Sequence, residues 1–455
     1  MEVLLRQPEY LYKKVKLIFI CVLFLFTNLL KAQTLYFPPL SGNTWDTISP
    51  SRLGWCQPRI DSLYSFLTTH GTDGFVMLKN GKIVLEKYFG RFRVDSVHTW
   101  ESMGKSLTSV LVGISAQNNM LNIGDSVCKY LGMGWTAETP AEERNITLRN
   151  LLTMTSGLNP YPPNPCSDLD TNAGCLQYLA DTGAQWAYYT GASGKLEAVL
   201  SIASGLPFNT FTNTYLGSLI GLSGVWAGIQ FYSTPRDMAR FGLLCLNKGI
   251  WSSDTILRDT TYFREMTNTS QNFNLSYGYL WWLNGKNSFI SADTQLLIQS
   301  TLVINAPTDM YCALGKYDQK IYIVPSQGFV VVRTGTAAHL GNNAISPFDN
   351  ELWLYIDSLN CNSPAGVNKP TEYAGFTIYP NPGNGIFNYK SVTNKDELWQ
   401  IDIYNSIGQK IYYTTLNTQT NTSKIDLSMQ PAGIYLYRVL AKNATTLATG
   451  KLVIQ

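Results

Sequence analysis

Charged side chains are scarce in this chain: Asp, Glu, Lys and Arg make up 14% of its 455 residues, and the formal net charge is +3. No cluster of Lys and Arg stands out after the N-terminus, so the sequence does not favour nucleic acid as a partner. Histidine is scarcer still, with three residues, and none has a spacing such as His-x-x-x-His that is typical of metal ligands. We therefore expect no nucleic-acid partner, no metal and no other cofactor.

Long apolar runs are also lacking, apart from one near the N-terminus. Lysines precede an apolar run over residues 17–30, and a Lys-Ala-Gln segment with a small residue follows it. The run is short for a membrane span, and its flanks are those of a cleavable signal peptide. We expect residues 1–33 to be a signal peptide and the protein to be exported without a stable membrane span; the alternative is an uncleaved anchor.

Cysteines are few, but an exported protein can oxidise them. Seven of the eight lie outside the apolar run. Cys166 and Cys175 bracket a short polar loop and form the favoured pair, whereas Cys56 and Cys361, which flank the first and last expected helices of the main domain, form a weaker one. Cys245 lies in an apolar helix and is expected to be an inert buried thiol.

Hydrophobic residues, by contrast, make up 45% of the chain, and its length allows two or three domains. After an N-terminal extension at 34–56, we expect the main domain over 57–360. β-rich segments near both of its ends predict two hairpins, terminal helices are expected at 58–69 and 350–359, and a stretch at about 118–290 is mostly helical. This order predicts an α/β (α+β) fold, with an antiparallel sheet flanked by helices and a helical domain inserted.

The composition changes after the main domain. Residues 361–374 resemble a linker, and residues 375–455 alternate short β-rich segments with turn residues at the spacing of a β-sandwich. This last stretch contains no histidine or cysteine. We expect a small all-β domain that carries no catalytic group.

A candidate for chemistry stands at the start of an apolar-periodic helix, in the segment Ser102-Met103-Gly104-Lys105. Residues three apart share a helix face, so the Lys105 amine is expected beside the Ser102 hydroxyl, where it can activate the serine as a nucleophile. A Ser-x-x-Lys pattern alone is expected roughly once by chance in a chain of this length. The other reading of the pattern is a serine N-cap before a buried helix.

The C-terminal stretch closely resembles the sorting domain of cargo of the type IX secretion system. Four segments carry the resemblance: Tyr379–Gly385, Ile403–Gln409, Leu427–Tyr435 and Gly450–Ile454. It implies that secretion machinery is a partner and that the protein is secreted or held at the cell surface. The alternative is an adhesive or carbohydrate-binding sandwich.

The main domain resembles the serine β-lactamase, penicillin-binding-protein and esterase family, in particular its class C-like branch. Besides the Ser-x-x-Lys segment, three segments match in the family's order: Ile146–Leu158, Thr234–Leu244 and Tyr277–Trp282. The stretch around residues 321–335 is most similar to family members that hydrolyse esters or linear amides, including the aminohexanoate-oligomer hydrolases. The resemblance implies the family's fold, in agreement with the pattern of helices and strands.

The resemblance also implies roles for individual residues. Tyr188 stands in the place of the motif tyrosine that shares the base role with Lys105, and Thr190 replaces the motif asparagine. Gly315 follows no cation, unlike the Lys-Thr-Gly motif of β-lactamases, and the backbone N–H groups of Ser102 and Lys316 would form the oxyanion hole.

One further residue, His339, is expected at the rim of the cleft, where it is a candidate for substrate contact against the alternative of a surface histidine. Together these features predict a secreted serine hydrolase that cleaves an ester or a linear amide of a small-molecule or peptide-like substrate through an acyl-enzyme on Ser102. A β-lactamase or D,D-peptidase, and a catalytically silent surface or binding protein, remain the alternatives.

Overall fold

The computed structural model describes residues 35–292, 295–339, 343–361, 376–391, 398–405, 409–417, 423–440 and 446–455. The expected signal peptide and almost all of the expected linker lie outside these residues. Among the described helices, none is both long and apolar enough to cross a membrane.

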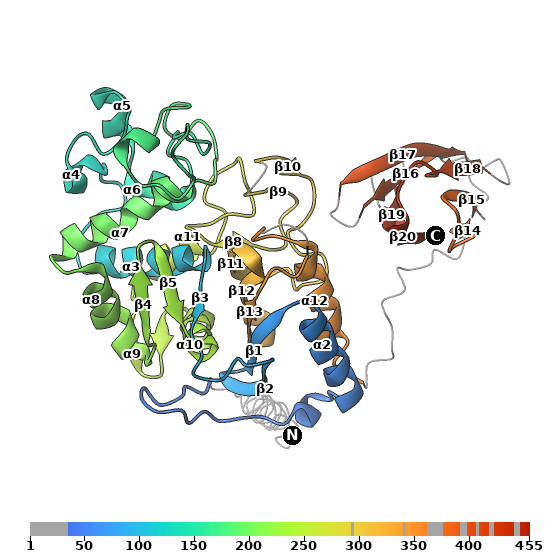
Figure 1. Ribbon diagram of the computed structural model, residues 1–455, viewed down its shortest axis with the longest axis horizontal. Helices are drawn as coiled ribbons and strands as arrows, with labels where there is room; N and C mark the ends of the chain where they lie inside the picture. The colour runs from blue at the N-terminus through green and yellow to red at the C-terminus, as the bar shows by residue number, and fades with distance from the viewer. Residues whose placement is uncertain are drawn as a thin grey trace, which may run out of the picture.

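A six-stranded antiparallel sheet forms the centre of the main region, residues 35–361 (Figure 1). Its strand order is β2-β1-β13-β12-β11-β8, with the bounds β1 Thr72–Lys79, β2 Lys82–Tyr88, β8 Trp282–Leu283, β11 Tyr311–Gly315, β12 Gln319–Val324 and β13 Phe329–Gly335. The two predicted hairpins are present as β1-β2 and β12-β13. They join through the pairing of β1 with β13, so the two ends of the region meet in the middle of the sheet.

Helices cover both faces of this sheet. On one face lie α2 (Gln57–Thr69) and α12 (Pro347–Asp357), and on the other lie α3 (Met103–Gln117) and α10 (Pro235–Leu246). Both faces of β12 and β13 are therefore buried, which explains why these strands are continuous apolar runs with little alternation. Thr234 and Asp237 form a capping box at the start of α10, and α12 begins three residues before its predicted start because Ser346 caps it.

The region between the two hairpins is mostly helical, as predicted. Its other helices are α4 (Cys128–Leu131), α5 (Pro140–Asn145), α6 (Leu148–Thr153), α7 (Thr190–Ser204), α8 (Phe208–Thr212), α9 (Ser218–Ile220) and α11 (Thr260–Met266). It also holds a small sheet that the sequence pattern did not predict, formed by β3 (His98–Thr99), β4 (Gly224–Ala227) and β5 (Gln230–Ser233). Strands of two to four residues are too short to show a period of two.

Two short two-stranded sheets complete the main region. They are formed by β6 (Ile250–Trp251) with β7 (Asp254–Thr255), and by β9 (Phe289–Ile290) with β10 (Leu297–Ile298). Both predicted disulfides are present: Cys56–Cys361 joins the start and the end of the region, and Cys166–Cys175 closes a loop. Cys245 is buried in α10, and burial raises the pKa of its thiol, as expected for an inert group.

The C-terminal region contains the predicted all-β fold. One sheet has the order β14-β15-β18 and the other β17-β16-β19-β20. The bounds are β14 Phe376–Tyr379, β15 Ile386–Ser391, β16 Leu398–Tyr404, β17 Lys410–Asn417, β18 Ser423–Asp426, β19 Gly433–Leu440 and β20 Thr446–Ile454. Side chains such as Phe387, Ile401 and Val439 form a hydrophobic core of its own, separate from that of the main region.

Candidate active site

Ser102 and Lys105 lie at the start of α3, and their side chains meet as the three-residue spacing predicts. Lys105 Nζ donates a hydrogen bond to Ser102 Oγ at 3.0 Å. Most of α3 is buried, so the pair stands on a rigid element. Glu101, directly before the serine, has a φ of 50°, a left-handed conformation that is costly for a residue with a Cβ. The serine therefore sits on a strained turn that the surrounding structure holds in place.

The electrostatic environment of Lys105 suits a base. Desolvation lowers the pKa of its amine to about 8, the attraction of Asp168 opposes this shift, and the repulsion of Lys316 adds to it. Lowering a lysine pKa from its usual value increases the neutral fraction near neutral pH, and only the neutral amine can accept a proton. A lysine in this environment can accept a proton from a neighbouring hydroxyl group.

Tyr188 faces the same amine. Lys105 Nζ lies 5.1 Å from the centroid of the Tyr188 ring. The ring stacks on Trp282 at 5.9 Å, and it makes an edge contact with Tyr277 at 6.2 Å. Packing between aromatic rings fixes the direction of the phenol, so the motif residue identified from sequence is held beside the Ser102–Lys105 pair.

A cavity of about 320 Å³ opens beside this group. Its lining includes five of the residues named from sequence: Ser102, Lys105, Tyr188, Thr190 and Lys316. These residues come from segments more than 200 positions apart, so the fold assembles them in one place. A cavity of this size can hold a small substrate.

Gly315 brings β11 close to the serine turn. A Cβ added to Gly315 would lie 2.6 Å from the backbone oxygen of Trp100 and 2.9 Å from Cβ of Glu101. A larger residue would force these atoms apart, so glycine permits the close approach of β11 to the backbone directly before Ser102. Gly315 is not itself among the residues that line the cavity.

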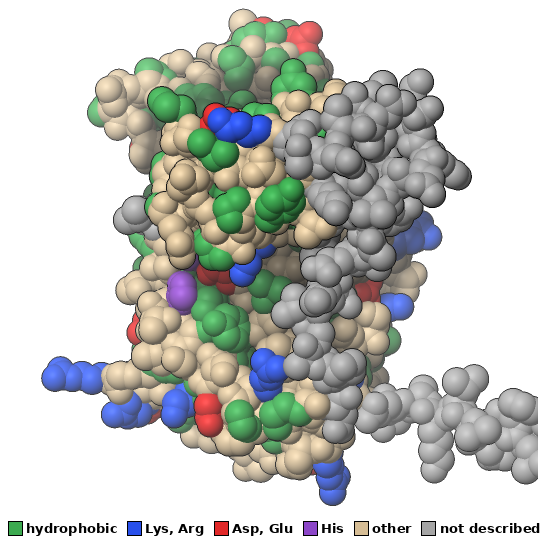
Figure 2. Space-filling view, turned by 90° about the vertical axis from the view of Figure 1, so that its right-hand side faces the viewer, with side chains coloured by type: hydrophobic (Ala, Val, Ile, Leu, Met, Phe, Trp, Pro, Cys, Tyr) green, Lys and Arg blue, Asp and Glu red, His purple; other side chains and the backbone are tan. Residues whose placement is uncertain are grey.

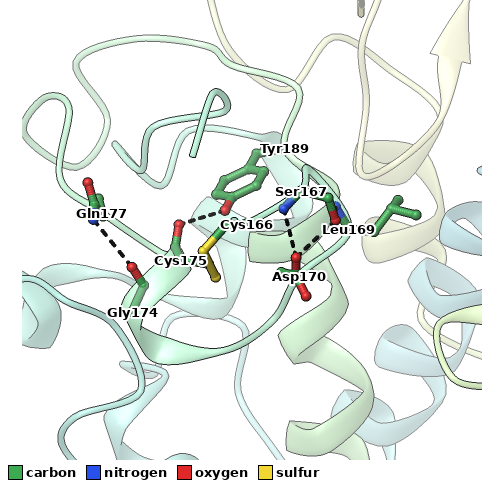
Figure 3. Close-up of a disulfide and its surroundings, with 8 residues drawn as sticks. All are labelled: Cys166, Ser167, Leu169, Asp170, Gly174, Cys175, Gln177 and Tyr189. Carbon is green, nitrogen blue, oxygen red and sulfur yellow. Dashed lines mark hydrogen bonds between the residues drawn. A yellow bond between two sulfur atoms is a disulfide. The ribbon is translucent and has the colours of Figure 1, made fainter. Parts of the chain in front are cut away.

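The Lys316 side chain lines the cavity, but it has a partner there. Its Nζ lies 3.6 Å from Asp168 Oδ2, and both side chains are partly exposed. Asp168 belongs to the loop that the Cys166–Cys175 disulfide closes (Figure 3). The hydroxyl of Tyr189 donates to the backbone oxygen of Cys175 at 2.9 Å, so this loop is tied to the neighbour of Tyr188.

Sequence reasoning missed Glu197, which also lines the cavity. Thr190 and Glu197 are seven residues apart on α7 and therefore lie on one face of the helix. Burial raises the pKa of the Glu197 carboxyl to about 8, and the charge of Lys105 opposes that shift. The helical spacing from Thr190 was the signal that could have revealed this residue.

His339 lies elsewhere. The chain after β13 passes near the turn between β11 and β12, since the N–H of Ala338 donates to Asp318 Oδ2 at 2.9 Å. The imidazole of His339, however, contacts Glu351 of α12 at 2.9 Å, and His339 is not among the residues that line the cavity. The chain leaves the sheet on the side of α12, so the direction of the side chain could not be predicted from the hairpin alone.

Two family models match the chain. Residues 68–349 match the model described as β-lactamase, and residues 377–455 match that of a secretion system C-terminal sorting domain. The chain belongs to the β-lactamase family. The predicted relationship is confirmed for both regions, and the family indicates a hydrolase. The sorting domain indicates export by the type IX system, to the cell surface or the medium.

Solved structures show the same fold. A β-lactamase homologue from Bacteroides dorei has a TM-score of 0.54 at 18% identity, covering 67% of this chain and 99% of its own. A 6-aminohexanoate-dimer hydrolase homologue from Bacillus anthracis has a TM-score of 0.53 at 21% identity, covering 71% of this chain and 87% of its own.

A more distant neighbour is the octameric penicillin-binding protein homologue from Pyrococcus abyssi. Its TM-score is 0.51 at 12% identity, covering 81% of this chain and 98% of its own. Among curated proteins, none matches the chain. The structural neighbours therefore establish the predicted fold, a mixed β-lactamase-like architecture with helices around an antiparallel sheet.

Proposed function

We propose that this protein is a secreted serine hydrolase that cleaves an ester or a linear amide through an acyl-enzyme on Ser102. The observation that carries the proposal is the 3.0 Å hydrogen bond from Lys105 to Ser102 Oγ inside a cavity that Tyr188 also lines. A nucleophile within hydrogen-bond reach of a base with a lowered pKa is the arrangement that covalent catalysis requires.

In the proposed reaction, Ser102 Oγ attacks the carbonyl carbon of the substrate, and its proton passes to the Lys105/Tyr188 pair. The backbone N–H groups of Ser102 and Lys316 donate to the oxyanion of the tetrahedral intermediate. The pair then returns the proton to the departing alcohol or amine, which leaves an ester of Ser102. Water attacks this ester, the acid is released and the serine regains its proton.

The charges around the cavity favour an uncharged acyl group. Ala313 and Leu314 precede Gly315, so the strand provides no cation at the position where β-lactamases and D,D-peptidases hold a substrate carboxylate. Lys316 is paired with Asp168, and the cavity also has the carboxyl groups of Glu101 and Glu197 in its lining. Lys105 is engaged with Ser102 Oγ and Lys316 is paired with Asp168, so neither lysine is placed as a dedicated cation for a substrate carboxylate. Ester or linear-amide substrates fit better than β-lactams.

We also propose that residues 1–33 are removed as a signal peptide, that residues 57–360 form the hydrolase domain, and that residues 375–455 direct passage through the secretion machinery. The match of the C-terminal residues to a sorting-domain model supports this order. Thr190 and Gly315 are proposed to shape the substrate site, Thr190 by lining it and Gly315 by admitting the backbone of Lys316.

The test compares a wild-type protein without residues 1–33 with its Ser102→Ala variant. Both are treated with a fluorophosphonate probe and assayed on short p-nitrophenyl esters and on nitrocefin. We expect the wild type to be labelled and to hydrolyse the ester but not nitrocefin, and Ser102→Ala to lose both labelling and turnover. Ser253→Ala, which changes an exposed serine in the β6-β7 turn, is the matched control and should behave as wild type.

Each contrary result has a distinct meaning. Nitrocefin turnover at a rate comparable with the ester would identify a β-lactamase instead. Absence of both labelling and turnover in a folded wild-type protein would identify a catalytically silent member of the family.

A further inference from the structure

Three side chains of types that can bind a metal ion lie close together on the side of the sheet that α2 and α12 cover. His70 directly follows α2, His339 follows β13, and Glu351 lies in α12. One potential ligand atom of each lies within 4.8 Å of the others. His339 Nε2 is 2.9 Å from Glu351 Oε2, and His70 Nε2 is 3.7 Å from the same oxygen. Two of the three histidines of the chain thus meet at one carboxylate.

The ring of His70 is oriented by its other nitrogen. Nδ1 lies 2.8 Å from the backbone oxygen of Phe66, and because a carbonyl oxygen only accepts, Nδ1 carries the hydrogen. In the neutral ring the lone pair is then on Nε2, which faces Glu351. Metal-binding histidines typically donate their second ring nitrogen to such a carbonyl, which fixes the tautomer and the ring plane. A lone pair opposite a carboxylate oxygen is unfavourable unless a proton or a metal cation lies between them.

The backbone at the three positions is held by groups that do not take part in the cluster. Arg333 Nη2 donates to the backbone oxygen of His70 at 2.7 Å, and Asp318 accepts from the N–H of Ala338, next to His339. Both Arg333 and Asp318 are buried. Glu351 is set by α12, whose start is fixed by its capping box. Ligands on a rigid frame lose little entropy when they bind an ion.

The cluster is open to solvent. The side chains of His70, His339 and Glu351 are 23%, 32% and 38% exposed. An ion can therefore enter from solution, and a water molecule has room to complete its coordination. A histidine is visible at the surface in Figure 2, with acidic and basic side chains near it.

We propose that His70, His339 and Glu351 bind one divalent transition-metal ion, with Zn²⁺ as the best match. Two imidazole nitrogens and one carboxylate oxygen, completed by water, are an established ligand set for Zn²⁺. Bonds of about 2.0–2.1 Å in a tetrahedron place ligand atoms roughly 3.3 Å apart, a spacing that small side-chain rotations reach from the observed one. The ion would clamp the end of α2, the segment after β13 and α12 together, away from the Ser102 cavity.

The test uses the untagged wild-type protein after treatment with a chelator that is then removed. Zn²⁺ is titrated in competition with a chromophoric zinc chelator, and Co²⁺ is added to a second sample to record visible ligand-field absorption. We expect one equivalent of Zn²⁺ to bind, the Co²⁺ spectrum to show nitrogen-containing coordination, and Zn²⁺ to raise the midpoint temperature of unfolding.

Variants separate a metal site from a simple ion pair. His70→Ala, His339→Ala and Glu351→Gln should each weaken Zn²⁺ binding by about 100-fold or more, beyond the 10–100-fold that loss of an outer-shell group typically costs. His98→Ala is the matched control, because the third histidine pairs with Asp73 at 3.6 Å outside the cluster. The His98→Ala variant should still bind one equivalent of Zn²⁺. Binding of Zn²⁺ that is equally tight in His70→Ala and wild type, or no binding at micromolar concentration, would overturn the proposal whatever the hydrolase assay shows.

Discussion

Two lysines on opposite faces of the central sheet are both removed from water, yet their pKa values move in opposite directions. Lys105 has Ser102 Oγ as its hydrogen-bond partner, and desolvation lowers its pKa to about 8. Lys320 is fully buried, but it lies 3.0 Å from Asp349 and 3.2 Å from Asp318, and the charges of these groups outweigh desolvation and raise its pKa. Burial alone therefore does not set the role of a lysine; the presence of paired carboxylates does.

The difference distinguishes a lysine that can act as a base from one that stabilises the fold. Lys320 also donates to the backbone oxygen of Ala344, and Tyr322 donates to the same Asp349, so the network joins β12 to α12. A lysine kept charged in this way holds two elements together. A lysine kept partly neutral, as Lys105 is, can take a proton from Ser102.

The largest effect is expected for Lys105→Met, which removes the amine and keeps the volume of the side chain. We expect kcat/KM on a p-nitrophenyl ester to fall by about 10³–10⁴, at the upper end of what a general base contributes. The free energy of unfolding should change little or increase, because a desolvated amine is removed. A loss below about tenfold would mean that Lys105 is not part of the base.

Lys320→Met tests the structural role of Lys320. It leaves Asp318 and Asp349 buried without their cation, and breaking a buried pair in this way costs about 3–5 kcal/mol. Urea unfolding followed by circular dichroism measures the loss. The kcat of the molecules that remain folded should stay near the wild-type value, and an unchanged unfolding midpoint would contradict the structural role.

Tyr188→Phe tests whether the Tyr188 hydroxyl takes part in proton transfer together with Lys105. The ring and its stacking on Trp282 are retained, so the fold should not change. Loss of the hydroxyl is expected to lower kcat by about 10²-fold, as for a group in the proton path, with a smaller effect on KM. Steady-state kinetics on the same ester measure the two constants, and an effect confined to KM would assign Tyr188 to binding alone.

The smallest effect is expected for Glu197→Gln. When ionised, the Glu197 carboxyl raises the pKa of Lys105; because its own pKa is about 8, it carries this charge only in the upper part of the pH range, and its removal should lower the pKa of Lys105 slightly. Activity requires the neutral amine, so the rising limb of the pH profile of kcat/KM should move to lower pH, by less than about one unit for a single nearby charge. A shift of this rising limb to higher pH would contradict the predicted direction. Asp254→Asn is the control, because it removes an exposed carboxylate that does not line the cavity, and it should leave the profile unchanged.

Local sequence signals were sufficient for parts of this structure. The three-residue spacing of Ser102 and Lys105, the Asn80-Gly81 turn of the first hairpin and the capping box at Thr234 are each decided by neighbours in the chain. The strands of the C-terminal region were also predictable, because turn residues separate them at regular intervals. In these cases the physical cause lies within a few residues of its effect.

Long-range groupings were not predictable in the same way. Lys320 lies in an apolar strand, and its partners Asp318 and Asp349 become apparent only when α12 packs on the sheet. The His70, His339 and Glu351 cluster spans 281 positions and has no common motif. Glu197 could be found only from its helical spacing to Thr190, and which face of α7 turns to the cavity is set by the packing of the apolar face of the helix.

The pH dependence of fluorophosphonate labelling at Ser102 tests the central claim most directly, because it reports the nucleophile without a substrate or a deacylation step. The labelling rate should rise with the neutral fraction of Lys105 and level off above a pH of about 8, in line with the lowered pKa of this amine. In Lys105→Met the rate should be low and flat across the same range. A wild-type rate that does not depend on pH, or the same profile in both proteins, would show that Lys105 does not activate Ser102.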